Sequence, residues 1–320
     1  MNRIKTSAVL LLSFAFSVNV TAQNTLARES KATAPKSSKT RCTGKGVELQ
    51  VLGSGGPETQ TGRASSSYLI WRDGKARVLV DSGGGSALRF GEAGAKMADL
   101  ELVLFTHLHA DHSADFPALL KSSYFENRQR NLPVYGPAGN ALFPSTPEFV
   151  RNLFDAKHGA FRYLSEFITP GEGSYQVQAH AVEPGAQEVK RVFVSNGISA
   201  FATPVIHGPV PSLAWRVVIG NLRLVFSGDT NGNLEKLAAA ANIFVAHNAV
   251  PEGATGTARK LHMPPSVIGK IAATAKVKKL VLSHRMLRTL GKEAETRAAI
   301  TQHYKGSIEF ANDLDCFAVR

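Results

Sequence analysis

Short apolar, β-branched runs separated by polar or glycine-rich segments dominate the hydrophobic pattern of this chain. They predict strands over residues 47–52, 67–71, 77–80, 100–105, 198–206, 213–219, 222–226, 243–246, 279–282 and 308–310. Helical periodicity predicts helices over residues 86–97, 112–124, 146–156, 234–241, 264–275 and 292–304. Neighbouring strands mixed with strand–helix alternation are typical of an α/β fold whose sheets are covered by helices.

Five of the predicted strands run directly into residues that bind metals in other proteins. Their sequences are RVLVDSGGG (77–85), LVLFTHLHADH (102–112), FATPVIHGP (201–209), LRLVFSGDT (222–230) and LVLSHRM (280–286). Buried strands are rigid, so side chains at their ends are held in the fixed positions that catalysis or metal binding requires. We therefore expect the functional site at these strand ends.

The N-terminus has the pattern of an export signal. Arg3 and Lys5 precede an apolar stretch over residues 8–18, and small residues at Val20 and Ala22 predict cleavage after Ala22. This stretch is shorter than a membrane-spanning helix, so no membrane span is expected in the mature protein. Residues 1–22 are thus predicted to be a signal peptide, 23–40 a flexible leader and 41–320 one folded domain in the periplasm or outside the cell.

Composition and net charge restrict the class of protein and its partners. The chain of 320 residues is 43% hydrophobic, which is enough for a full core, and its net charge of +12 lies partly in the first 40 residues without blocks of like charge. We therefore expect no nucleic-acid partner, and the sequence leaves open whether the protein forms a homo-oligomer.

Export places Cys42 and Cys316 in an oxidising compartment, where they form either a disulfide or two separate thiols.

The segment HLHADH carries the strongest chemical signal. His107 and His109, two positions apart on an extended segment, point to one side, while Asp111 and His112 approach from the start of the next helix. Imidazole and carboxylate are the zinc ligands that remain when thiolate is absent, and a catalytic ion needs about three protein ligands. This arrangement predicts two adjacent metal ions.

This segment resembles the HxHxDH signature of the metallo-β-lactamase superfamily. Further motifs of that family match in order at Asp81, His207, Asp229 and His284. The resemblance implies a single-domain, four-layer αββα sandwich with two Zn²⁺ ions, for which Mn²⁺ or Fe²⁺ are substitutes. It also implies the ligands: His107, His109 and His207 for the first ion, Asp111, His112 and His284 for the second, and Asp229 between them.

The aspartate in the bridging position, together with VLGSGGP (51–57), is similar to the branch that contains ribonuclease Z, cyclic-nucleotide phosphodiesterases and exported arylsulfatases. The segments GRASSSYLI (62–70), HADHSADFPALLKSS (109–123) and HGPVPSLAWRV (207–217) resemble the arylsulfatase-like group. The resemblance implies an exported dinuclear zinc hydrolase that cleaves aryl sulfate or phosphodiester bonds of a small anionic ester through a metal-bridging hydroxide. The alternatives are a lactonase or β-lactamase, a ribonuclease Z-like RNA endonuclease, and a metal-binding protein without catalysis.

Several further residues have two interpretations. The resemblance makes Asp111 a proton acceptor and His262 a proton donor for the leaving group, whereas His262 as a simple helix cap is the alternative. Asp81 either orients a ligand or forms a turn, and His247 either supports a ligand or is a buried structural histidine. Arg63, Arg285 and Arg288 either bind an anionic substrate or are surface charges.

Overall fold

Two seven-stranded β-sheets form the centre of the structure, a computed structural model that describes residues 42–183, 185 and 188–320. In spatial order the first sheet contains β14 (Cys316–Ala318), β1 (Val47–Gly53), β2 (Ser67–Arg72), β3 (Lys75–Val80), β4 (Leu102–Leu104), β5 (Leu132–Pro137) and β6 (Val177–Val182). The second contains β13 (Ser307–Phe310), β12 (Lys279–Ser283), β11 (Ile243–His247), β10 (Leu222–Phe226), β9 (Val210–Ile219), β8 (Ile198–His207) and β7 (Lys190–Ser195). The predicted signal peptide and leader lie outside the described residues.

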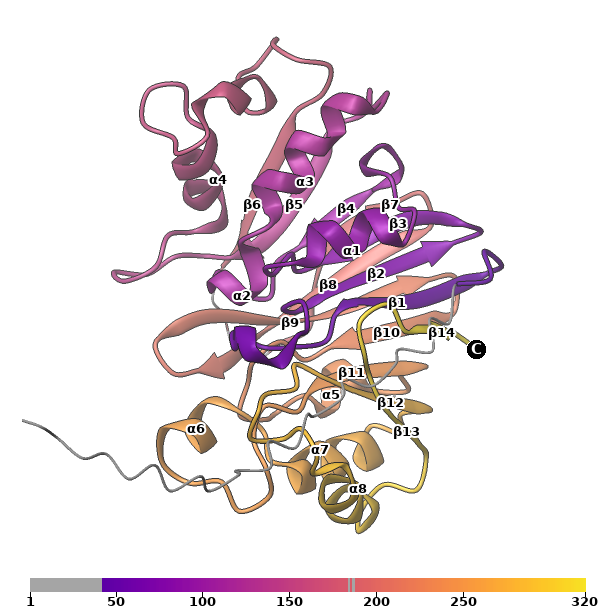
Figure 1. Ribbon diagram of the computed structural model, residues 1–320. Helices are drawn as coiled ribbons and strands as arrows, with labels where there is room; N and C mark the ends of the chain where they lie inside the picture. The colour runs from indigo at the N-terminus through magenta and orange to yellow at the C-terminus, as the bar shows by residue number, and fades with distance from the viewer. Residues whose placement is uncertain (1–41, 184, 186–187) are drawn as a thin grey trace, which may run out of the picture. The chain divides into compact units, whose positions relative to one another are not determined.

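Helices cover the outer face of each sheet (Figure 1). The α-helices are α1 (Ser86–Glu92), α2 (Ala110–Ser113), α3 (Phe116–Ser122), α4 (Thr146–Phe154), α5 (Glu235–Ala238), α6 (Gly256–Leu261), α7 (Pro265–Thr274) and α8 (Glu293–Thr301). Short 3₁₀ helices are η1 (Thr59–Thr61), η2 (Met97–Asp99), η3 (Ser123–Phe125) and η4 (Arg162–Phe167). Side chains of α1, α3 and α4 pack on the first sheet, and those of α5, α7 and α8 pack on the second. The predicted αββα sandwich is confirmed.

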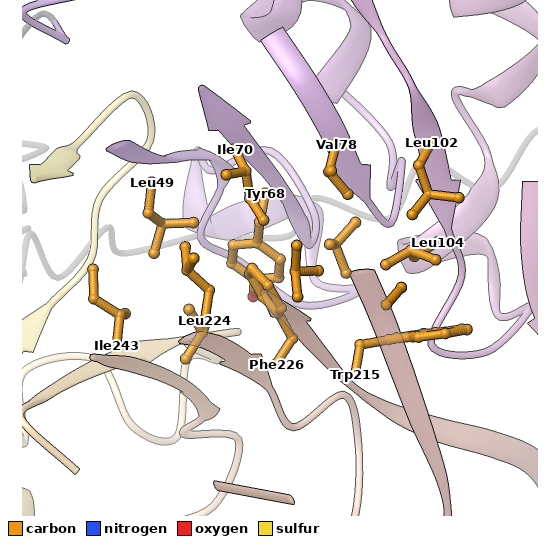
Figure 2. Packing of buried hydrophobic residues seen from close by; sticks show 14 of the residues in the cluster. Leu49, Tyr68, Ile70, Val78, Leu102, Leu104, Trp215, Leu224, Phe226 and Ile243 are labelled. Atoms are coloured by element: carbon orange, nitrogen blue, oxygen red, sulfur yellow. The ribbon is translucent and has the colours of Figure 1, made fainter. Parts of the chain in front are cut away.

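The strands look continuously apolar in sequence because both faces of each sheet are buried. Alternate residues of β2 illustrate this: Tyr68 and Ile70 join the core between the sheets, while Leu69 and Trp71 join the core under the helices. Figure 2 shows the side chains of the two sheets meeting in the inner core. Within the described residues no helix is long and apolar enough to cross a membrane.

The structure differs from the predicted elements in four strands and two of the predicted helices, and it adds α6. Strands β5, β6, β7 and β14 were not predicted, because polar or small residues interrupt their apolar pattern, as in VQAHAV of β6. The helix predicted over 86–97 is divided into α1 and η2, and the helix over 112–124 into α2, α3 and η3. In both cases the helical spacing of apolar residues continues through a turn, so the sequence pattern does not show where the helix is interrupted.

A disulfide links Cys42 to Cys316, with 5.3 Å between the two Cα atoms. The bond joins the segment before β1 to β14, the edge strand that pairs with β1. Of the two interpretations of these cysteines, the disulfide is the one that the structure confirms.

Candidate metal centre

The carboxyl ends of four strands meet at one edge of the sandwich and bring the predicted metal ligands together. Strand β4 of the first sheet leads into the HLHADH segment, and β8, β10 and β12 of the second sheet lead to the remaining ligands. The cluster comprises His107, His109, Asp111, His112, His207, Asp229 and His284. All seven predicted ligands thus lie in one site, and their assignment to particular ions stays a prediction.

His107, His109 and His207 form the first group. Nε2 of His107 lies 3.1 Å from Nδ1 of His109, and one nitrogen from each of the three rings falls within 4.8 Å of the others. Nδ1 of His207 donates to the carbonyl oxygen of Leu261 at 3.1 Å, because a carbonyl only accepts. This hydrogen bond leaves Nε2 of His207 free to face the cluster.

His112, His284 and Asp111 form the second group. Oδ2 of Asp111 lies 3.5 Å from Nε2 of His112 and 3.4 Å from Nε2 of His284. Asp229 lies between the two groups, with Oδ1 3.2 Å from Nε2 of His284 and Oδ2 3.6 Å from Nε2 of His207. Asp229 is therefore the carboxylate placed to serve both groups.

Asp81 lies behind the second group and holds His112. It accepts from the backbone N–H and the hydroxyl of Thr106 at 2.7 and 2.8 Å, and its Oδ2 lies 2.8 Å from Nδ1 of His112. A carboxylate on one ring nitrogen directs the other nitrogen outward, as is usual for metal-binding histidines. Asp81 therefore orients a predicted ligand, which is the first of its two interpretations. Thr106, which the sequence analysis missed, anchors Asp81.

Two glycines allow the backbone to approach this cluster closely. A Cβ atom at Gly56, in the VLGSGGP segment, would lie 2.5 Å from Cε1 of His284, and one at Gly83 would lie 2.1 Å from the carbonyl oxygen of Asp111. Both distances are too short for any side chain. These glycines therefore support the positions of His284 and Asp111.

The donor set fits two divalent cations. Ligand atoms bound to zinc at about 2.0–2.1 Å in a tetrahedron are about 3.3 Å apart, close to the separations of 3.1–3.9 Å within the cluster. Nε2 of His112 and both ring nitrogens of His284 are buried without a hydrogen-bond partner. A buried polar atom without a partner is costly, so these nitrogens require a further binding partner such as a metal ion.

The charges of the cluster differ between the two groups. Burial, together with the neighbouring His112, lowers the pKa of His107 well below its usual value, so His107 is neutral and ready to bind a cation. In the second group, burial opposes the charged form of His284, but Asp229 and Asp111 outweigh it and raise its pKa to about 10. Burial likewise opposes ionisation of Asp229, yet His284 and His247 hold its pKa well below the usual range.

Zinc binding to the second group should therefore release protons. His284 is protonated at pH 7.5 without metal and must lose its proton to bind, so affinity should rise about tenfold per pH unit up to about pH 10. Calorimetry at pH 7.5 in two buffers of different ionisation enthalpy measures this: we expect at least about one proton per second-site ion, and His284→Gln should reduce that release. Binding heats that are identical in both buffers would contradict this account.

His262 follows α6 and lies at the rim of the cluster. Its Nδ1 is 3.8 Å from Oδ2 of Asp229 and has no hydrogen-bond partner. Burial lowers its pKa to about 4, with Asp229 opposing and His284, His207 and Arg288 adding to the lowering. His262 therefore faces the site as predicted, but it needs an anion in addition to Asp229 to hold a proton at neutral pH.

Two of the three arginines considered as substrate contacts are structural. The guanidinium of Arg63 donates to Ser54 at 2.7 Å and to Asn312 at 2.8 Å. Arg285 is 4% exposed, pairs with Glu293 and lies over the ring of Phe310. Arg285 is buried and Arg63 is half-buried, and the polar contacts of both lie within the fold. Arg288 is half-buried, its Nε donates to the carbonyl oxygen of Ala249 at 2.5 Å, and its charge lowers the pKa of His262, so it lies near the site.

His247, at the end of β11, lies beside the cluster, and hydrogen bonds occupy both of its ring nitrogens. Nδ1 lies 2.7 Å from Oδ1 of Asp229, and Nε2 lies 2.9 Å from the hydroxyl of Tyr68. It therefore supports a predicted ligand, which is the first of its two interpretations. Tyr68 was missed because its place in an apolar strand looks like ordinary core. Asn248 was also missed: it is fully buried next to His247 and neither end of its amide is hydrogen-bonded.

An αββα sandwich that gathers buried histidines and aspartates at its strand ends defines a class of metal-dependent hydrolases. Residues 60–284 match the model of the metallo-beta-lactamase superfamily, and the chain belongs to that superfamily. It is similar to ribonuclease Z of Mycobacterium marinum, with 29% identity over 283 residues that cover 84% of this chain and 97% of the relative.

Solved structures with the same fold include human tRNase Z, short form. Its TM-score is 0.66 at 18% identity, and the match covers 85% of this chain and 98% of that one. Zn²⁺-bound PqqB from Methylobacterium extorquens has a TM-score of 0.59 at 14% identity, with coverage of 85% and 99%. At these identities the likeness concerns the fold.

Proposed function

We propose that this protein is a metal-dependent phosphodiesterase that acts outside the cytoplasm. The similarity to ribonuclease Z over 84% of this chain and 97% of the relative carries this proposal, because a ribonuclease breaks phosphodiester bonds. The two ligand groups on either side of Asp229 support it further. Zinc is the proposed metal, since the ligands are imidazoles and carboxylates and PqqB, which shares the fold, is zinc-bound.

Two bound cations would supply positive charge for an anionic substrate and water activated at neutral pH. Asp111 is the predicted ligand carboxylate with the more accessible side chain, 11% exposed against 4% for Asp229, so it is placed to accept the proton of the attacking water. Arg288 adds positive charge beside His262 and favours an anionic substrate. The charge of that substrate would raise the pKa of His262 and allow it to protonate the leaving group.

The proposed location rests on the first 22 residues and on the disulfide. Disulfides persist in oxidising compartments and are rare in the cytosol, so Cys42–Cys316 agrees with the predicted export. This location favours a small phosphodiester over cytoplasmic RNA as the substrate. A protein recovered from the periplasm with Gln23 as its first residue is expected, and retention of residues 1–22 in the cytoplasm would refute the export proposal.

A substrate panel tests the reaction. The zinc-loaded protein beginning at Gln23 should hydrolyse bis(4-nitrophenyl) phosphate faster than 4-nitrophenyl sulfate, a lactone or a chromogenic cephalosporin, and a chelator should abolish the activity. RNA and cyclic nucleotides in the same panel distinguish a nuclease from a small-molecule enzyme. Turnover of the sulfate alone would instead support the arylsulfatase-like prediction, and no turnover with two bound zinc ions would refute hydrolysis.

His262→Ala should slow substrates with poor leaving groups more than those with good ones. A nitrophenolate leaves without a proton, whereas an alkoxide needs one, and loss of a positioned acid costs about 10²–10⁴-fold. The rates for a nitrophenyl and an alkyl ester of the same phosphate measure this, with exposed His303→Ala as the control. An equal decrease for both leaving groups would make His262 a binding or structural residue.

A further inference from the structure

A buried chain of hydrogen bonds connects the core between the sheets to the metal centre. The hydroxyl of Tyr68 lies 2.9 Å from Nε2 of His247, and Nδ1 of His247 lies 2.7 Å from Oδ1 of Asp229. Tyr68 belongs to β2 of the first sheet, whereas His247 ends β11 of the second. The three residues are at most 3% exposed. This series of hydrogen bonds therefore crosses from one sheet to the other and is shielded from water.

The chemistry of the three groups fixes the direction of each hydrogen bond. An ionised carboxylate only accepts, so Nδ1–H of His247 donates to Asp229. Nε2 of the neutral ring then carries the lone pair, and the hydroxyl of Tyr68 donates to it. Both nitrogens of His247 are therefore occupied, and the ring acts on the metal centre through Asp229.

These hydrogen bonds determine the orientation of the Asp229 carboxylate. The bond from His247 holds Oδ1, which also lies 3.2 Å from Nε2 of His284. Oδ2 is then directed to the other side, 3.6 Å from Nε2 of His207 and 3.9 Å from Nε2 of His112. Rotation of the carboxylate would remove Oδ2 from its place between the two ligand groups.

The ring of Tyr68 is itself held firmly. Its centroid lies 5.5 Å from that of Phe226, and Figure 2 shows it among the core side chains of both sheets. A phenol at this place keeps His247 in one tautomer and one orientation. A phenylalanine would fill the same space but leave Nε2 of His247 without its donor.

We propose that Tyr68 and His247 are positioning residues that orient the carboxylate of Asp229 for two cations. Partners of this kind, which act on a metal ligand without touching the ion, typically change metal affinity by about 10–100-fold. The proposal rests on the metal centre of the proposed function and is independent of the substrate.

Zinc affinity, measured by competition with a chromophoric chelator, tests the proposal. Tyr68→Phe should bind the more weakly held zinc about 10–100-fold less tightly, with two ions still bound at saturation. Tyr175→Phe is the matched control: Tyr175 is also buried, and its hydroxyl lies 2.7 Å from Ser123 in the core under the helices. The control should lose stability comparably while keeping wild-type zinc affinity.

A double-mutant cycle shows whether Tyr68 acts through His247. His247→Ala should weaken zinc binding at least as much as Tyr68→Phe, and combining the two should add little, because the tyrosine no longer has a partner. Wild-type affinity in Tyr68→Phe, an equal loss in Tyr175→Phe, or additive losses in the cycle would each overturn the inference. If the wild-type protein itself binds no zinc, the proposed function fails instead.

Discussion

Replacing Asp229 with asparagine should reduce phosphodiester hydrolysis by more than about 100-fold and lower the zinc content from two ions to one per chain. Loss of a residue that only supports a metal ligand already costs about 10–100-fold, and Asp229 is placed between both ligand groups. The asparagine keeps the shape of the side chain but removes its charge and one of its two oxygen donors. Initial rates and metal analysis of the same preparation measure the two effects together.

Asp73→Asn provides the control for this substitution. Asp73 is exposed in the turn between β2 and β3 and has a positive φ, which asparagine also adopts readily. Its replacement should leave both rate and zinc content unchanged. An Asp229→Asn protein that keeps two zinc ions and full activity would exclude Asp229 as the shared ligand.

Replacing both Cys42 and Cys316 with serine should lower the free energy of unfolding by about 3–5 kcal/mol. The disulfide connects residues 274 positions apart, so breaking it releases a very large loop in the unfolded chain. Denaturant unfolding, followed by fluorescence or circular dichroism, measures the change.

The reducing agent dithiothreitol supplies the control for the disulfide. It should lower the unfolding midpoint of the wild-type protein to that of the double-serine variant and leave the variant unchanged. Equal stability of the oxidised wild-type protein and the variant would show that the disulfide does not stabilise the fold, and would weaken the argument for an oxidising compartment.

The four-layer sandwich was implied by the resemblance, but the gathering of candidate ligands at the strand ends can be predicted from the sequence for a physical reason. Strands that are buried on both faces form continuous apolar runs, and each run stops where polar ligands begin, so the edge of the sheets is marked directly in the sequence. His107 and Asp229 lie three residues beyond the ends of β4 and β10, and His284 follows β12 immediately. The spacing within HLHADH then limits which side chains reach the same point.

What the sequence did not predict depends on pairing across the fold. Tyr68 has the same local pattern as its apolar neighbours, and only the approach of β11 from the other sheet reveals its bond to His247. Arg63 and Arg285 look like candidate anion contacts in the sequence, but in the fold Arg63 donates to Asn312, 249 positions further along, and Arg285 pairs with Glu293. The edge strand β6 depends on pairing with β5 and not on its own propensity.

The central claim is that two metal ions occupy this cluster with Asp229 between them. A crystal structure with anomalous scattering data collected at the zinc absorption edge tests it most directly. Two peaks about 3.5–4 Å apart are expected, one beside His107, His109 and His207 and the other beside Asp111, His112 and His284. A single peak, or peaks away from these side chains in protein prepared with excess zinc, would contradict the account.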